Sequence, residues 1–202
     1  MATRAPLRPL SAAFRSAVRT PHHAAAARGF RTTAAVPIRV GDRLPDLDVL
    51  MEATPGNRVN LAEEAGRTSD AVIIGVPAAF SGVCSAKHIP SYIRHPALKD
   101  FGLVAVVSVN DVFVMKAWGE TLDPASETGI RFLADPSGAF TKALDLAFDG
   151  AAIFGGDRSK RYAIVLRDGK IESIAVEPDN TGTSVSMADQ VLGAAKKADW
   201  NA

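Results

Sequence analysis

The sequence predicts an α/β fold in which helices flank a central mixed β-sheet. Two apolar runs, Ala71 to Val76 and Leu103 to Val109, are strand-sized and resemble strands that are buried on both faces. Helical patterns alternate with these runs, and a hairpin signal follows near the carboxyl end. The 202 residues, 47% hydrophobic and 22% charged, suit one globular domain with a short extension.

Each predicted element follows from its local pattern. After the first strand, apolar spacing from Ser81 predicts a helix that Pro90 should kink or interrupt. Asp168-Gly169 predicts a tight hairpin turn, because a type I′ turn needs positive φ at both central residues. The other predicted elements are helices over Val112 to Trp118, Gly138 to Leu146 and Ser186 to Lys197, and strands over Arg131 to Ala134, Tyr162 to Leu166 and Ile171 to Val176. This order favours the thioredoxin fold, in which ligands sit at the carboxyl ends of the parallel strands.

The amino-terminal segment has the composition of a mitochondrial transit peptide. It contains no acidic residue before Asp42, and its arginines alternate with Ala, Ser and Thr. Leu10, Phe14 and Val18 recur at helical spacing, which allows an amphipathic basic helix. Arg28-Gly29-Phe30 resembles a matrix-peptidase site. We therefore expect a transit peptide over 1–30, a flexible segment over 31–37, a domain over 38–202 and a location in the mitochondrial matrix; the alternative is a disordered basic tail.

Charge and hydropathy exclude several functional classes. A net charge of +1 provides no overall basic field for binding nucleic acid. No apolar run approaches the ~20 residues that span a bilayer, so we expect no membrane insertion. We also expect no cofactor and no bound metal, since a single cysteine cannot form a structural zinc site made of several cysteines.

Cys84 is the only cysteine, so an intramolecular disulfide is impossible. The residues Pro77-Ala-Ala-Phe-Ser81-Gly-Val-Cys84 resemble the signature of the peroxiredoxins, which is proline, three residues, threonine or serine, two residues, cysteine. Further blocks, from Ser85 to Pro90, Ser108 to Asp111, Ala134 to Phe140 and Val176 to Asp179, are similar to the type-five subfamily, which also holds the type II plant enzymes. The resemblance extends over roughly Ile38 to Ala198 and implies a thiol-dependent, antioxidant peroxidase.

The chemistry of peroxide reduction explains these residue types. A thiolate must attack one peroxide oxygen, whereas a free thiol with a pKa near ~8.5 is mostly protonated at neutral pH. A helix amino terminus and a guanidinium can both favour the anion. The resemblance assigns the guanidinium to Arg161, the hydroxyl that contacts peroxide to Ser81 and shielding from water to Pro77. Backbone N–H groups near Gly82, Val83 and Cys84 are supporting candidates for binding the oxygen that becomes negative.

Each candidate also has a plainer interpretation. Cys84 could be a packing residue, Ser81 an N-cap, and Arg161 a solvated charge with Arg158 and Lys160 close by. His88 could act as a base, but a structural hydrogen bond is the favoured interpretation. Asn110, Asp111 and Trp118 could line the pocket or a dimer contact, or could simply form a turn and part of the core.

The chain departs from animal members of the subfamily after Val176-Glu-Pro-Asp179. Those members carry a resolving cysteine in the next segment, and here Val185 stands in its place. The resemblance therefore implies recycling by an external thiol, either glutathione with glutaredoxin or thioredoxin, and a homodimer. Two alternatives remain: a peroxide sensor that passes its oxidation to a client protein, and a Cys/His hydrolase, which is the weaker because His88 and His95 lie on the helix that carries Cys84.

Overall fold

The computed structural model describes residues 37–199, so the predicted transit peptide and nearly all of the 31–37 segment lie outside the described residues. The strands are β1 Leu50–Glu52, β2 Arg58–Val59, β3 Asp70–Val76, β4 Leu103–Ser108, β5 Arg131–Ala134, β6 Ala147–Phe148, β7 Arg158–Ser159, β8 Tyr162–Arg167 and β9 Lys170–Val176. The helices are α1 Leu61–Gly66, the π-helix η1 Cys84–His88, α2 Ile89–Ile93, the 3₁₀-helix η2 Pro96–Asp100, α3 Val112–Leu122, α4 Ala139–Ala143, α5 Ala151–Phe154 and α6 Ala188–Asp199.

The main sheet has seven strands in the order β2-β1-β5-β4-β3-β8-β9. Strand β3 pairs in parallel with β4 and antiparallel with β8, and β5 pairs in parallel with β4. The sheet is therefore mixed, as predicted. All residues of β3 after Asp70 and all of β4 are buried, which accounts for the continuous apolar runs in the sequence.

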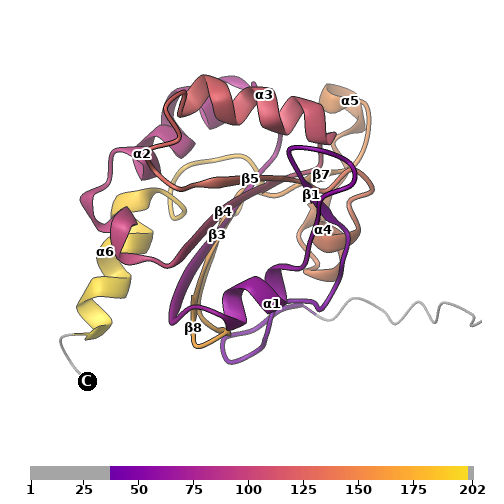
Figure 1. Cartoon of the computed structure of the whole chain (residues 1–202). Helices are drawn as coiled ribbons and strands as arrows, with labels where there is room; N and C mark the ends of the chain where they lie inside the picture. The colour runs from indigo at the N-terminus through magenta and orange to yellow at the C-terminus, as the bar shows by residue number, and fades with distance from the viewer. Residues whose placement is uncertain (1–36, 200–202) are drawn as a thin grey trace, which may run out of the picture. The chain divides into compact units, whose positions relative to one another are not determined.

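Alternate side chains of β3 enter two separate apolar cores. Val72, Ile74 and Val76 belong to a core with residues of α2, α3 and α6, whereas Ala71 and Ile73 belong to a core with residues of α1 and α4. Figure 1 shows these two groups of helices on opposite sides of the sheet. The period-two alternation of a strand thus produces the three layers, helix, sheet and helix.

The predicted hairpin is confirmed between β8 and β9. Asp168 and Gly169 have φ values of 50° and 71°, so both central residues take the left-handed conformation that a type I′ turn requires. The turn pairs Arg167 with Lys170, and a bulge between Val165 and Leu166 shifts the register farther along, so that Tyr162, the residue after Arg161, pairs with Val176.

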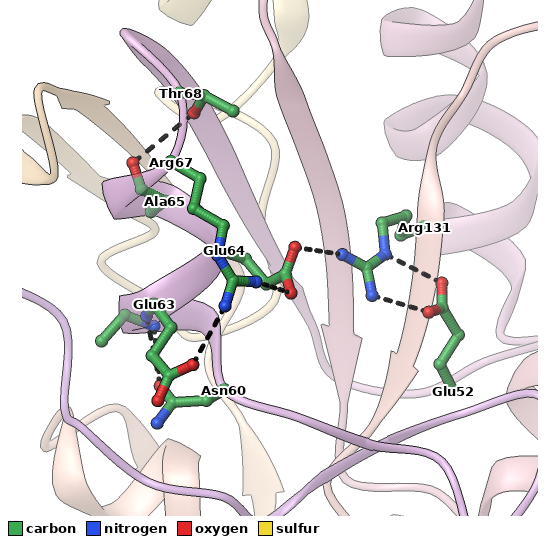
Figure 2. A network of polar contacts seen from close by, with 9 residues as sticks. Glu52, Asn60, Glu63, Glu64, Ala65, Arg67, Thr68 and Arg131 are labelled. Carbon is green, nitrogen blue, oxygen red and sulfur yellow. Dashed lines mark hydrogen bonds and ion pairs between the residues drawn. The ribbon is translucent and has the colours of Figure 1, made fainter.

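An ion-pair network joins α1 to the neighbouring strands β1 and β5. Arg131 on β5 donates to both oxygens of Glu52 on β1, at 3.0 and 2.7 Å, and to Glu64 on α1 at 3.2 Å. Figure 2 shows the Glu64 carboxylate between the guanidinium groups of Arg131 and Arg67. The bidentate geometry makes the Glu52 pair the strongest member of this network.

Several helices differ from the sequence-based expectation. Helix α3 extends to Leu122, beyond the predicted Trp118, and α4 covers only Ala139–Ala143 of the predicted Gly138 to Leu146. The helix after Ser81 is not interrupted at Pro90, because the π-helix η1 runs directly into α2. Pro90 has no N–H to donate, and the wider π-helical turn before it, in which the Ile89 N–H donates to the Cys84 carbonyl, accommodates the missing bond. The last helix begins at Ala188 instead of Ser186, because the Ser186 N–H donates to the Glu177 carboxylate. None of the helices between residues 37 and 199 is long and apolar enough to cross a membrane.

Candidate active site

Cys84 lies just beyond the carboxyl end of β3, in the first turn of the helical segment that follows the loop 77–81. It is the first residue of η1 and is fully buried. Ala79 N–H donates to the Asn110 side chain at 3.0 Å, and Asn110 also accepts from Ser108 at 2.8 Å, so the end of β4 holds this loop in place. The two parallel strands together therefore position the thiol at the edge of the sheet where this fold binds ligands.

Arg161 is nearly completely buried, and its guanidinium contacts the thiol. Its Nη1 donates to the Sγ of Cys84 at 3.4 Å, and its Nε donates to the Thr181 carbonyl at 3.1 Å. The Arg161 backbone bonds to Asn180 and Glu177, at 2.7 and 2.9 Å. Because arginine only donates, sulfur is the acceptor in this contact, and a thiolate accepts better than a thiol.

His88 touches the same guanidinium nitrogen. Its Nδ1 lies 3.0 Å from Arg161 Nη1 and must accept, because arginine has no acceptor. The other ring nitrogen, Nε2, therefore carries the proton and donates to the Ser186 carbonyl at 3.0 Å. Burial lowers the pKa of His88 to about 3, with a further lowering by the charge of Arg161. A neutral ring whose lone pair is already occupied does not act as a general base, so the geometry favours the structural interpretation of His88.

Ser81 does not cap the helix that follows it. Its hydroxyl donates to the Ala78 carbonyl at 2.9 Å, which leaves the oxygen lone pairs free to accept a hydrogen bond. Ser81 also lines a pocket of about 280 Å³, together with Pro77, Gly82, Val83, Phe148, Ile153, Phe154, Arg161 and Thr181. The pocket thus combines an apolar wall with the guanidinium that contacts Cys84.

Four of these lining residues are absent from the sequence-based site: Phe148, Ile153, Phe154 and Thr181. Phe148 lies on the two-residue strand β6, and Ile153 and Phe154 lie on the four-residue helix α5. Elements this short carry no periodic signal that a sequence could reveal. Thr181 enters through a loop, and no local pattern marks it.

Arg158, the alternative to Arg161, lies away from the thiol. Its guanidinium donates to the carbonyls of Val109 and Phe154 and lies over the Phe154 ring, 5.6 Å from the ring centroid. Arg158 therefore fixes the segment that carries α5, whereas Arg161 makes the contact with sulfur.

The remaining candidates support the site from outside the pocket. Asp111 caps α3 by accepting from the backbone of Phe113 and Val114. Trp118 is buried, and its indole N–H donates to Ser85 at 3.0 Å, beside Cys84 in the chain. His95 caps η2. In the part of the chain that the structure describes, no group of three or more His, Cys, Asp or Glu residues could hold a metal ion.

Comparison with known proteins gives a consistent result. Residues 39–192 match the Redoxin family. The chain is 39% identical over 158 residues to peroxisomal membrane associated protein 20 of Schizosaccharomyces pombe, covering 77% of this chain and 97% of that protein. It is 38% identical over 125 residues to mitochondrial peroxiredoxin-2F of Arabidopsis thaliana, covering 60% and 61% respectively. The crystal structure of peroxiredoxin 5 from Alvinella pompejana matches with a TM-score of 0.68 and 35% identity, over 80% of this chain and 99% of that one.

A thioredoxin fold that places a thiol against a guanidinium defines a thiol-dependent oxidoreductase. The chain belongs to the peroxiredoxin family and is a thiol-dependent peroxidase with a single cysteine. These findings confirm two predictions from the sequence: the resemblance to the peroxiredoxins and the thioredoxin fold.

Proposed function

We propose that Cys84 is the nucleophile that reduces hydrogen peroxide and organic hydroperoxides, with Arg161, Ser81 and Pro77 completing the catalytic site. The observation that carries this assignment is the 3.4 Å contact between Arg161 Nη1 and Cys84 Sγ, made inside the protein, where water screens it little. A permanent cation at this position stabilises both the thiolate and the negative charge that develops on peroxide.

The reaction then proceeds by displacement at oxygen. The Cys84 thiolate attacks one oxygen of ROOH, the S–O bond forms as the O–O bond breaks, and RO⁻ leaves and takes up a proton as ROH. The sulfur, oxidised by two electrons, becomes a sulfenic acid. Arg161 can donate to the peroxide and the leaving oxygen, Ser81 can accept from the peroxide O–H, and the N–H groups of Gly82 and Val83 lie beside the same pocket.

External thiols must complete the cycle, because the chain contains no second cysteine. One thiol attacks the sulfenic sulfur, releasing water and forming a mixed disulfide, and a second thiol attacks that disulfide and restores Cys84. We propose glutathione with glutaredoxin, or thioredoxin, as the reductant, on the basis of the family resemblance.

The test separates turnover from sensing. Purified protein is given excess hydrogen peroxide with glutathione, glutaredoxin and glutathione reductase, or with thioredoxin and its reductase, and NADPH loss is followed. Consumption of many equivalents per protein supports the peroxidase function. Consumption that stops after one equivalent with both systems would instead favour the sensor that passes its oxidation to a client.

We further propose a homodimer. Large apolar side chains are exposed around the pocket and at the start of α3, with exposed fractions of 55% for Phe80, 42% for Val83, 65% for Phe113 and 78% for Ile153. Sedimentation should give a dimer for the wild type and a monomer for Phe113→Glu. Val40→Glu changes an equally exposed apolar side chain outside this group, and it should leave the dimer intact.

For the location we propose the mitochondrial matrix, with residues 1–30 removed on import. The basic, acid-free amino-terminal segment supports this, and the relatives include both a mitochondrial and a peroxisomal protein by name. A carboxyl-terminal tag should report mitochondria, with a mature terminus near Arg31. A peroxisomal signal, or a chain that retains Met1 or Ala2, would overturn the proposal.

A further inference from the structure

The loop between β9 and α6 supplies the carbonyl groups that hold the active site. Arg161 Nε donates to the Thr181 carbonyl at 3.1 Å, and the Ser186 carbonyl accepts from both His88 Nε2 and the Tyr92 hydroxyl, at 3.0 and 2.7 Å. This loop has no regular secondary structure to fix those carbonyls. Something else must therefore determine where they lie.

The Glu177 carboxylate fixes the end of the loop that carries the Ser186 carbonyl. Glu177 is the first residue after β9; its side chain is 1% exposed and accepts five hydrogen bonds. Oε2 accepts from the backbone N–H and hydroxyl of Ser184, at 2.8 and 2.6 Å. Oε1 accepts from the Val185 N–H at 2.9 Å, and from the N–H and hydroxyl of Ser186 at 2.9 and 2.7 Å. One side chain thus binds three consecutive residues of the loop.

Glu177 is ionised although it is buried. Burial by itself raises the pKa of a carboxyl group, but the hydrogen bonds from the hydroxyls of Ser184 and Ser186 and from the loop backbone lower that of Glu177 to about 2. Within residues 37–199, no ion pair to Glu177 is found. Burying a carboxylate that only neutral donors stabilise costs free energy. The protein retains Glu177 despite this cost, which indicates that its geometry is needed.

The charge itself does not assist the reaction, because a second anion near a thiolate opposes its formation. The contribution of Glu177 must therefore be geometric. It holds Ser186, whose carbonyl fixes the proton of His88 on Nε2, and this leaves Nδ1 free to accept from Arg161. The same loop presents Thr181 to Arg161 Nε, and there Asp179 accepts from the Thr181 N–H at 3.2 Å. Both contacts orient the guanidinium toward Cys84.

We propose that Glu177 is a positioning residue for the peroxidase reaction, acting through the Ser186 carbonyl on His88 and, through His88, on Arg161. This inference rests on the proposed function of Cys84 and Arg161. It predicts that loss of the carboxylate slows the oxidation of Cys84 even where the fold survives, because small misplacements of a reacting group can cost about 10²-fold in rate.

The experiment compares Glu177→Gln with Glu172→Gln. Both make the same chemical change in the same part of the chain, but Glu172 lies on β9 outside the loop, beside Arg167. Single-turnover oxidation of Cys84 by hydrogen peroxide and titration of thiolate absorbance are measured for each. We expect Glu177→Gln to lower the rate constant by about 10-fold or more and to move the thiolate titration to higher pH, with little change for Glu172→Gln.

A double-variant cycle tests whether the effect passes through Arg161. If Glu177 acts by orienting the guanidinium, Glu177→Gln adds little further loss once Arg161→Ala is present. Losses that multiply in the double variant, or an unchanged rate in Glu177→Gln alone, would overturn the proposal. Should Arg161→Ala alone have no effect, the proposed catalytic site fails instead.

Two milder variants keep the test decisive if Glu177→Gln does not fold. Ser184→Ala removes one of the five hydrogen bonds, and Glu177→Asp keeps the charge on a shorter side chain. We expect both to be folded by circular dichroism and slower than wild type in the same single-turnover assay. Wild-type rates in both variants would contradict the positioning role.

Discussion

Replacing Arg161 by alanine removes the cation that touches the reacting sulfur. The guanidinium is 2% exposed, and its Nη1 lies 3.4 Å from Cys84 Sγ. Its backbone bonds to Asn180 and Glu177 do not involve the side chain, so the start of β8 should stay in place. The substitution therefore perturbs the charge at the site more than it perturbs the fold.

The expected magnitude follows from the contact. A unit charge 3.4 Å from a thiolate contributes about 5 kcal/mol at an effective dielectric constant of about 20. Water that enters the vacated space recovers part of this. Loss of one preorganised charge contact at a developing anion typically costs about 2.7–4 kcal/mol, which corresponds to a rate constant lowered by roughly 10²-fold to 10³-fold.

The assay pairs stopped-flow oxidation of Cys84 by hydrogen peroxide with titration of thiolate absorbance. Arg161→Ala should lower the rate constant and move the titration to higher pH. Arg161→Lys should recover part of each change, because a single ammonium cannot bind sulfur and peroxide together as a planar guanidinium does. Arg158→Ala, whose side chain binds Val109 and Phe154, is the matched control and should have a much smaller effect.

Two results would refute this reasoning. A larger loss in Arg158→Ala than in Arg161→Ala would mean that the catalytic arginine is wrongly assigned. Wild-type rates in both variants would mean that the start of the helix alone activates the thiol, and the 3.4 Å contact would then have no catalytic role.

Three further predictions concern the nucleophile, pH and packing. Cys84→Ser should abolish peroxide reduction with the fold retained by circular dichroism, since it changes little volume, and turnover above a few per cent of wild type would reject Cys84 as the nucleophile. In unfolded chains His88 takes up a proton below about pH 6.5, whereas in the folded protein it does so only near pH 3. The free energy of unfolding should therefore fall on acidification through this range, by about 2 kcal/mol from about pH 7 to about pH 5. Urea unfolding measures this slope, which His88→Gln should largely remove; Glu177 adds to it only below about pH 4.5. Gly75→Ala should lower the free energy of unfolding, measured in urea, by about 1–3 kcal/mol, because the added Cβ overlaps the buried Tyr162 ring. The control is Gly66→Ala, whose added Cβ meets no atom; equal stabilities of the two variants would contradict the packing.

The sequence predicted the centre of the fold well because the signals there are local. The apolar runs of β3 and β4 and the Asp168-Gly169 turn each determine their own conformation, and the structure has all three. By contrast, β1, β2 and α1 depend on contacts across the chain, such as the bonds of Arg131 to Glu52 and Glu64. Their short lengths leave no periodic pattern to detect.

The sequence predicted only those residues of the candidate site that belong to a recognisable motif. Cys84, Ser81 and Arg161 were named from the sequence, and the structure brings all three to one place. The tautomer of His88 could not be predicted, because it depends on a carbonyl 98 residues further along the chain. The role of Glu177 was hidden for the same reason, since its partners lie in an irregular loop.

The central claim is that the Cys84 thiolate itself takes an oxygen atom from the peroxide. The most direct measurement is mass spectrometry of the reduced protein after one molar equivalent of hydrogen peroxide, with a dimedone-type reagent present to trap sulfenic acid. We expect one trapped adduct per chain, located by peptide mapping at Cys84 and lost from Cys84→Ser. Peroxide consumed with Cys84 unmodified, or oxygen found instead on methionine, would contradict it.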